Sequence, residues 1–156
     1  AADWLASKDP MQLSPNDPYL QDRYALAVFW FATHDSALRE DEDDEQLNWD
    51  RHDNWMTGFG ICAWYGIQCH HIGDDMKNTR YDANGRVTYF NITSNGVKGP
   101  IPDEFFRVNT DIRHINLSEN SITGTLPDLL REFAYLEDIY LNSNYIEGTL
   151  PRTLTS

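Results

Sequence analysis

Basic residues are scarce in this sequence. Lys and Arg together number 12, against 25 Asp and Glu, which gives a net charge of −13. A field of this sign repels nucleic acid and anionic membrane surfaces, so neither is expected as a partner. Much of the charge lies in one run, residues 40–45, which predicts a solvated loop. A Ca²⁺ loop is the alternative, but the run lacks the spaced oxygen ligands and the turn glycine of such loops.

Long hydrophobic runs are also missing. The longest apolar stretch extends from Tyr24 to Thr33 and is far shorter than the roughly 20 residues of a membrane-spanning helix. No direct membrane insertion is therefore expected within these residues. The chain begins with Ala1 and not with Met, which indicates a processed, trimmed or partial chain. Its 156 residues, 40% of them hydrophobic, are enough for one domain with a substantial core.

Only two cysteines are present, Cys62 and Cys69. A close pair of this kind is typical of a disulfide in an oxidising compartment. The alternative is a metal site that also uses His70 and His71. Zinc sites usually need a second ligand pair at finger-like spacing, and the sequence has none. We therefore expect neither a metal nor a cofactor.

One pattern recurs three times in the second half of the chain, over residues 90–102, 115–127 and 139–151. Each copy has two apolar residues in an L-x-L arrangement, then an Asn, and then Gly and an Ile-Pro or Leu-Pro pair. Asn95 and Asn120 are 25 residues apart, and Asn120 and Asn144 are 24 apart. This period is the signature of a leucine-rich repeat solenoid. The repeats are assigned to residues 87–110, 111–135 and 136–156.

The predicted fold is an α/β solenoid, a right-handed superhelix with short parallel strands. In each repeat the L-x-L segment is a strand whose apolar side chains point inward. Asn95, Asn120 and Asn144 are expected to form a ladder in which their amides satisfy backbone groups left unpaired by the turn.

The region before the repeats, residues 1–86, is interpreted as an N-terminal cap. It divides into a helix over about 18–33, an acidic loop over 35–61, the cysteine pair at 62–69 and a turn at 82–86. The Asn84-Gly85 pair in that turn favours a type I′ hairpin. Trp49 and Trp55 are expected to fix the long loop in place. Trp64 supplies a large buried ring, and Gly66 allows a close backbone approach.

The cap helix is expected to start at Pro18, with Asn16 or Asp17 as its N-cap. Apolar residues at helical spacing predict which side packs against the core. The stripe consists of Leu20, Tyr24, Ala27, Val28 and Phe31.

These motifs together resemble the plant-type subclass of leucine-rich repeat proteins. The segment Cys62-x-Trp64-x-Gly66-Ile67-x-Cys69 is similar to the N-terminal cap of that subclass, whose two cysteines are disulfide-bonded. The segment 21–33 resembles the cap helix of such proteins in diatoms and related algae. The resemblance implies a Cys62–Cys69 disulfide and an extracellular, receptor-like or secreted module. It also implies that the module binds a protein or glycan partner without catalysis.

Side chains between the inward apolar residues face outward on the concave strand surface. They form four columns with one residue per repeat. The columns are Thr88, Arg113 and Glu137; Tyr89, His114 and Asp138; Asn91, Asn116 and Tyr140; and Thr93, Ser118 and Asn142. The expected ligand-binding residues are Tyr89, Asn91, Arg113, His114, Asn116, Asp138 and Tyr140, because aromatic residues and Arg dominate binding hot spots. The convex face and the acidic loop remain alternative surfaces.

Two glycosylation sequons, Asn91-Ile-Thr93 and Asn116-Leu-Ser118, place both asparagines in one concave column. A glycan on either would block part of that face for a protein partner. Unused sequons that arose by chance are the alternative.

The last repeat shows no C-terminal cap, and a solenoid needs its final apolar face covered. We therefore expect further repeats, or another subunit, to pack on Ile139, Leu141, Ile146 and Leu150. A scaffold subunit of a larger complex is thus the alternative to a recognition module. A hydrolase inhibitor or a glycan-active enzyme is more remote, because none of the five histidines lies in a catalytic motif. The expected location is the secretory pathway, an extracellular space or another oxidising lumen, with any membrane tether in segments not present here.

Overall fold

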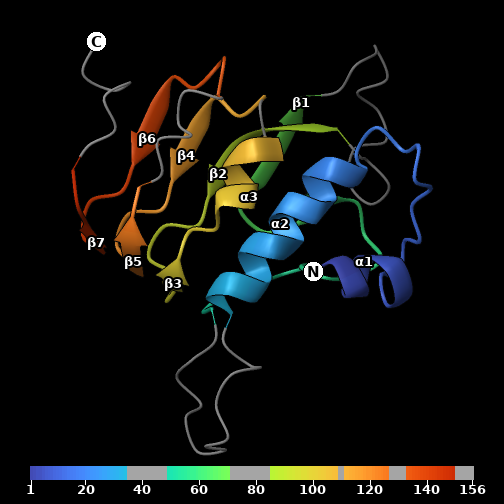
Figure 1. Cartoon of the computed structure of the whole chain (residues 1–156), viewed down its shortest axis with the longest axis horizontal. Coiled ribbons are helices and arrows are strands. Elements are labelled where there is room, and N and C mark those ends of the chain that lie inside the picture. The colour runs from blue at the N-terminus through green and yellow to red at the C-terminus, as the bar shows by residue number, and fades with distance from the viewer. Residues whose placement is uncertain (35–48, 71–84, 109–110, 127–132, 150–156) are drawn as a thin grey trace, which may run out of the picture.

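The computed structural model describes residues 1–34, 49–70, 85–108, 111–126 and 133–149. Helices α1 (Ala2–Ser7) and α2 (Leu20–Thr33) and the short 3₁₀ turn η1 (Ile61–Ala63) come before all the strands in the described part of the chain. In Figure 1, α2 lies between α1 and the strands. Helix α3 (Asp103–Val108) follows the first repeat motif and contacts α2.

Two sheets form the repeat region (Figure 1). The first has the order β1-β2-β4-β6, and the second has the order β3-β5-β7. Their strands are β1 (Ile67–His70), β2 (Arg86–Asn91), β4 (His114–Asn116) and β6 (Asp138–Tyr140), and β3 (Lys98–Pro100), β5 (Ser121–Thr125) and β7 (Tyr145–Glu147). Only β1 runs antiparallel to its neighbour among these strands. Parallel strands that recur with the motif are the expected geometry of a solenoid.

The apolar residues of the motif point inward, as the alternation predicts. Phe90, Ile115 and Ile139 are paired across β2, β4 and β6, and the first two are fully buried. Ile139, Leu141 and Ile146 are only partly buried and pack against the edge of the core. Leu150 lies outside the described residues.

The recurring asparagines have a direct structural role in the turns. Asn120 Oδ1 accepts hydrogen bonds from the backbone N–H groups of Asn95 and Val97, both at 3.0 Å. Its Nδ2 donates to the carbonyl oxygens of Ile92 and Leu117 at 2.6 and 3.0 Å. One side chain therefore links two successive repeats through buried backbone groups that would otherwise lack partners.

The asparagines before and after Asn120 also bond to backbone groups, but only Asn144 repeats its arrangement. Asn144 Oδ1 accepts from the N–H of Ile122 at 2.9 Å, and its Nδ2 donates to the Leu117 carbonyl at 2.8 Å. Asn95 instead exchanges hydrogen bonds with the backbone of Arg51, at 2.7 and 2.8 Å. The ladder thus continues from the repeats into the segment that precedes β1.

The packing face predicted for the cap helix is wrong for most of its residues, because only Ala27 of the predicted stripe is fully buried. Phe31 is 45% exposed, and Tyr24 and Val28 are only partly buried. The buried side instead carries Leu26, Phe29 and Trp30. Apolar side chains occur all around α2, so their spacing alone did not identify the side that meets the core.

Aromatic contacts explain why the Phe29 side is buried. The Phe29 ring lies 5.0 Å from Phe90, 5.2 Å from Phe105 and 5.8 Å from Trp49, measured between ring centroids. These partners come from the first repeat, from α3 and from the loop that precedes η1. Helix α2 is therefore the point at which three separate segments meet.

The start of α2 also differs from the expectation. The helix begins at Leu20, with Tyr19 at the N-cap position and no capping hydrogen bond from its side chain. Asp17 Oδ1 accepts a hydrogen bond from the Tyr19 N–H at 2.9 Å, so Asp17 stabilises the turn before the helix. Pro18 consequently precedes the helix instead of occupying its first position.

Tryptophans fix the loop before η1, as expected. Trp49, Trp55 and Trp64 are at most 4% exposed, and the Trp55 ring lies 4.8 Å from both of the others. The acidic run, His71, and Asp82 to Asn84 of the predicted turn lie outside the described residues.

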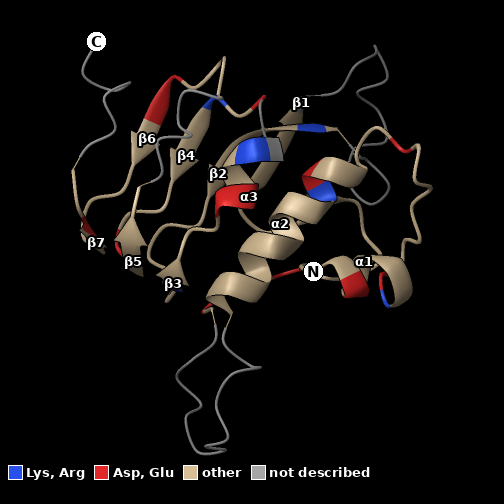
Figure 2. Ribbon diagram, in the orientation of Figure 1, with Lys and Arg blue, Asp and Glu red and all other residues tan. Residues whose placement is uncertain are grey.

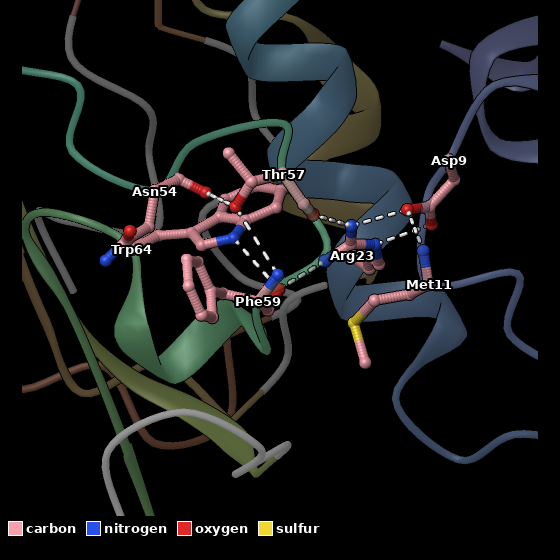
Figure 3. Close-up of polar contacts among 7 residues, drawn as sticks. All are labelled: Asp9, Met11, Arg23, Asn54, Thr57, Phe59 and Trp64. Atoms are coloured by element: carbon pink, nitrogen blue, oxygen red, sulfur yellow. Dashed lines mark hydrogen bonds and ion pairs between the residues drawn. The ribbon is translucent and has the colours of Figure 1, made fainter.

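A buried ion pair attaches the N-terminal segment to α2 (Figure 3). Arg23 and Asp9 have fully buried side chains, and Arg23 donates to both carboxylate oxygens of Asp9 at 2.5 and 2.6 Å. Arg23 also donates to the carbonyl oxygens of Thr57 and Phe59, at 2.7 and 3.0 Å. The guanidinium group therefore joins three chain segments.

A second charged cluster lies where α2 meets the first repeat. Asp22 is 3% exposed and pairs with Arg86 at 3.4 Å, while Arg86 also lies 3.5 Å from Asp111. Burial raises the pKa of Asp22 to about 6, and the nearby Asp111 carboxylate adds to this effect while Arg86 opposes it.

Candidate recognition surface

Two of the four predicted columns coincide with the strand register. Ser118 of the fourth predicted column is only 7% exposed, so its outward position is not confirmed. Tyr89 pairs with His114, and His114 pairs with Asp138. In the next column Asn91 pairs with Asn116, and Asn116 pairs with Tyr140. Strands β2, β4 and β6 therefore present two rows of polar and aromatic side chains on one face of the sheet. We call this face the concave surface.

Charged side chains pair with each other where β4 and β6 begin: Arg113 and Glu137 directly precede these strands, and His114 and Asp138 are their first residues. Arg113 Nη1 lies 2.8 Å from Glu137 Oε1, and His114 Nδ1 lies 3.0 Å from Asp138 Oδ2. His114 also has a second acidic neighbour, because its Nε2 atom lies 3.9 Å from Glu137 Oε2. These side chains are 36% to 53% exposed, and such pairs contribute little to stability. They remain available to a partner of complementary charge.

Aromatic residues extend the same surface. The Tyr89 ring lies 5.7 Å from the His114 ring, and Arg113 lies 5.6 Å from the centre of the Tyr135 ring. Tyr140 is 52% exposed on β6, the strand that begins at Asp138. Figure 2 shows acidic residues in red at the start of β6. Exposed aromatic rings beside charged groups are typical of interface anchors.

An open pocket of about 360 Å³ adjoins this surface at the edge formed by β1 and β2. Tyr65, Ile67, Gln68, Tyr89, Asn91 and Thr93 line it, together with the backbone of Gly66. Gly66 has a φ of +80°, and a β-carbon there would overlap the carbonyl oxygen of Asn91. The predicted close approach at Gly66 thus brings the cap segment against β2 and forms one side of the pocket.

Tyr65, Gln68 and Arg51 also belong to this region, although no motif in the sequence indicates it. The Arg51 guanidinium group lies 4.1 Å from the centre of the Tyr65 ring. Gln68 pairs with Tyr89 in the antiparallel register of β1 and β2. Alternation through Tyr65, Ile67 and Cys69 indicates which residues share a face of this segment. It does not indicate that β1 pairs with β2, because the paired residues are about twenty positions apart in the sequence.

Both sequon asparagines are half-buried, and their side chains already bond within the sequon. Asn91 Oδ1 accepts from the Thr93 N–H, and Asn116 Oδ1 accepts from the Ser118 N–H, each at 3.1 Å. The Thr93 and Ser118 hydroxyl oxygens are 3.1 Å apart. The two sequons therefore lie side by side on neighbouring strands.

Cys62 and Cys69 form the predicted disulfide, with their Cα atoms 5.6 Å apart. The bond joins η1 to β1 and excludes the alternative in which both thiolates hold a metal ion with His70 and His71. Within the described ranges, no group of three or more His, Cys, Asp or Glu side chains is placed to hold a metal ion. The same ranges contain no helix with the length and hydropathy needed to cross a membrane.

Comparison with solved structures places this geometry among known solenoids. The leucine-rich repeat ectodomain of the Arabidopsis thaliana membrane receptor kinase GASSHO1/SCHENGEN3 shares 26% sequence identity, with a TM-score of 0.57 over 85% of this chain. That structure contains CASPARIAN STRIP INTEGRITY FACTOR 2 as a bound partner. The aligned region is only 13% of the receptor ectodomain, so this chain spans a small part of that protein's length.

Two further structures have lower scores. The PEPR1-AtPEP1 structure is 22% identical, with a TM-score of 0.48. The matched parts are 85% of this chain and 19% of that one. The BIR2 ectodomain from Arabidopsis thaliana is 15% identical, with a TM-score of 0.44, and the matched parts are 86% of this chain and 73% of that one.

The family comparison agrees with the repeat pattern. A search among curated proteins finds no match. Residues 85–146 match the family model described as leucine rich repeat. This part of the chain is therefore a leucine-rich repeat segment with a solenoid fold of the kind found in plant receptor ectodomains.

Proposed function

We propose that the chain is a non-catalytic recognition module that binds a protein partner on its concave surface. The observation that carries the proposal is the in-register display of His114 on β4 with Asp138 on β6, flanked by Tyr140 on β6 and by Arg113 directly before β4. All four side chains are at least 36% exposed. Solenoids commonly use this face for binding. The likeness to a receptor ectodomain solved with a bound partner supports the same conclusion.

The chemistry of the surface favours a polypeptide partner with cationic side chains. Asp138 and Glu137 offer carboxylates, and the protein as a whole carries a net charge of −13. A field of this sign accelerates the approach of a basic partner and repels acidic ones. The Tyr140 ring supplies an apolar contact next to the charged groups, and Arg113 with His114 can receive an acidic or carbonyl group of the partner.

The proposed setting is an oxidising extracellular space, in a receptor-like or secreted protein. The Cys62–Cys69 disulfide supports this, because disulfides persist in such compartments and are rare in reducing ones. The receptor ectodomain similarity supports it independently.

The experiment uses two tyrosines that differ mainly in position. Tyr140 lies on β6 in the concave sheet, and Tyr145 lies on β7 in the other sheet; both are more than half exposed. Peptides selected from a display library on the purified, oxidised protein are measured against Tyr140→Ala, Arg113→Ala and Tyr145→Ala. We expect Tyr140→Ala to weaken binding by about tenfold or more, since anchors of this kind contribute roughly 2 kcal/mol.

The control and the contrary outcome follow from the same pair. Tyr145→Ala is expected to change the affinity by less than about twofold, and unchanged thermal midpoints would show that the variants still fold. Equal losses in both variants, or a loss only in Tyr145→Ala, would contradict the concave surface as the binding site. A partner that co-purifies at fixed stoichiometry from the native source and ignores both concave variants would favour the scaffold alternative.

A further inference from the structure

We propose that Asn91 carries an N-linked glycan whose first sugar occupies the pocket between β1 and β2. The inference rests on the proposed extracellular setting, because the modification requires passage through the secretory pathway. It does not require the proposed partner-binding role of the concave surface. It assigns to the pocket a saccharide attached to the protein itself.

The proposal is supported first by the position of Asn91 beside Tyr89 on β2. Residues two apart on a strand share a face, so the aromatic ring and the acceptor asparagine project in the same direction. The Asn91 Nδ2 atom, to which the sugar would be attached, lies 3.3 Å from the Tyr89 hydroxyl. A sugar on that nitrogen would begin next to the ring and stack its C–H groups on it.

The size and lining of the pocket also support the proposal. It lies at the small end of ligand pockets, which span roughly 300–1,000 Å³, and it therefore suits one or two sugar units. Tyr65 and Tyr89 provide aromatic faces, while Gln68 and Thr93 provide polar groups for sugar hydroxyls. Aromatic rings combined with amide and hydroxyl groups match a saccharide, which has both C–H faces and hydroxyl edges.

The second sequon lacks this surrounding. Asn116 does not line the pocket, and strands β2 and β6 flank it on both sides. Ser118 is only 7% exposed, and its hydroxyl donates to Asn116 Oδ1 at 2.6 Å. The residue two positions earlier is His114, which already contacts Asp138 at 3.0 Å. The two sequons therefore differ in whether an attached sugar lies at the pocket between β1 and β2.

A glycan at Asn91 would divide the concave surface. The sugar would cover Tyr89 and the β1 edge, and a protein partner would be confined to β4 and β6. Of the residues expected to bind a ligand, Arg113, His114, Asp138 and Tyr140 would then stay accessible, while Tyr89 and Asn91 would contact the glycan.

The first test is the site of attachment. The protein is secreted from a eukaryotic host, and its glycopeptides are identified by mass spectrometry. We expect a glycan on the peptide that contains Asn91, its loss in Asn91→Gln, and its retention in Thr93→Ser and in Asn116→Gln. A bare Asn91, with or without a glycan on Asn116, would overturn the proposal. Neither result depends on whether a partner binds the concave surface, so failure here is distinguishable from failure of the proposed function.

The second test asks whether the sugar occupies the pocket. Glycosylated protein is trimmed by an endoglycosidase to one N-acetylglucosamine and compared with unglycosylated protein from a bacterial periplasm. We expect the single sugar to raise the Tm by roughly 2–4 °C, the scale of a modest stability change in a domain of this size. The difference should vanish in Tyr89→Ala and persist in the control Tyr140→Ala. A Tm difference that is absent, or that survives Tyr89→Ala, would show that the sugar does not occupy the pocket.

Discussion

The cap, residues 1–70, and the repeat region, residues 85–149, are stabilised by different kinds of contact. In the cap, single side chains join segments that are far apart in the sequence: Arg23 binds Asp9 and the carbonyl oxygens of Thr57 and Phe59. In the repeats, one kind of contact recurs, as Asn120 and Asn144 each bond backbone groups of their own repeat and of the preceding one. The contacts of the cap therefore each occur once, whereas the asparagine contacts of the repeats recur with the period of the sequence motif.

The hydrophobic cores of the cap and of the repeat region also differ in whether their contacts recur. The cap core is built from tryptophans, with Trp30, Trp49, Trp55 and Trp64 in a connected series of ring contacts. The repeat core uses buried residues at equivalent motif positions, such as Ile92 with Leu117, and Val97 with Ile122. A unique contact has no neighbour that can replace it, whereas a periodic contact is shared along the solenoid. Substitutions in the cap should therefore act through one cooperative event, and substitutions in the repeats should depend on position along the stack.

The largest effect is expected at the buried ion pair of the cap. Asp9→Ala leaves the Arg23 guanidinium group buried without a counter-charge, since both side chains are fully buried. Removing one partner of a buried pair typically costs about 3–5 kcal/mol. We expect a loss of this size in the free energy of unfolding, measured by urea denaturation of the oxidised protein.

The matched control is the exposed pair Arg51–Asp53, in which both side chains are 62% exposed. Asp53→Ala should cost less than about 1 kcal/mol, because solvent screens exposed pairs. Similar losses for the two variants would mean that the Asp9 contact does not hold the cap together.

A smaller effect is expected in the asparagine ladder, and it should depend on position. Asn120→Ala removes the acceptor for the buried N–H groups of Asn95 and Val97. Each unsatisfied buried group costs about 1–3 kcal/mol, so the combined loss should be roughly 3 kcal/mol. Asn144→Ala should cost less, because Asn144 is more exposed and its Oδ1 accepts from the single N–H of Ile122. Equal losses, measured by the same denaturation, would contradict the idea that ladder contacts depend on burial.

The periodic half of the molecule was largely predictable from the sequence. Repeated spacing identifies equivalent positions, so the alignment of Asn95, Asn120 and Asn144 and the column of Tyr89, His114 and Asp138 follow from the motif. The turn hydrogen bonds of the asparagines follow from the chemistry of an amide, which donates and accepts at once. The pairing of Cys62 with Cys69 followed from the family resemblance.

The unique contacts of the cap were not predictable in the same way. No pattern relates Arg23 to Asp9, which lies in a segment without repeats, so only the folded chain reveals the pair. The buried face of α2 was predicted wrongly because both Phe29 and Phe31 are apolar. Packing against Phe90 and Phe105 selects Phe29. The pocket was missed because it joins the cap segment at Tyr65 to Asn91 on β2 across a long separation in sequence.

The last of these effects lies at the junction of the two regions, where Asp22 of α2 meets Arg86 and the backbone N–H of Val87 at the start of β2. Burial raises the pKa of Asp22 from 3.8 to about 6. The folded state thus holds the proton more tightly than the unfolded chain does. The contribution of Asp22 to the free energy of unfolding therefore decreases as the pH rises from about 3.8 to about 6, and is level above that.

Asp22→Asn replaces the carboxylate with a neutral group of the same shape and should remove this pH dependence. We expect the variant to be more stable than the parent at pH 7, on the order of 3 kcal/mol at about 1.4 kcal/mol per pKa unit, and equally stable near pH 3.5. The measurement is the difference between the two urea denaturation curves at intervals from pH 3.5 to 7. Asp111→Asn is the sharper control: the Asp111 carboxylate raises the pKa of Asp22, so its removal should move the pH-dependent step to lower pH without abolishing it. A flat difference curve for Asp22→Asn would show that Asp22 keeps an ordinary pKa and that the cap and repeats meet without a buried, proton-binding carboxylate.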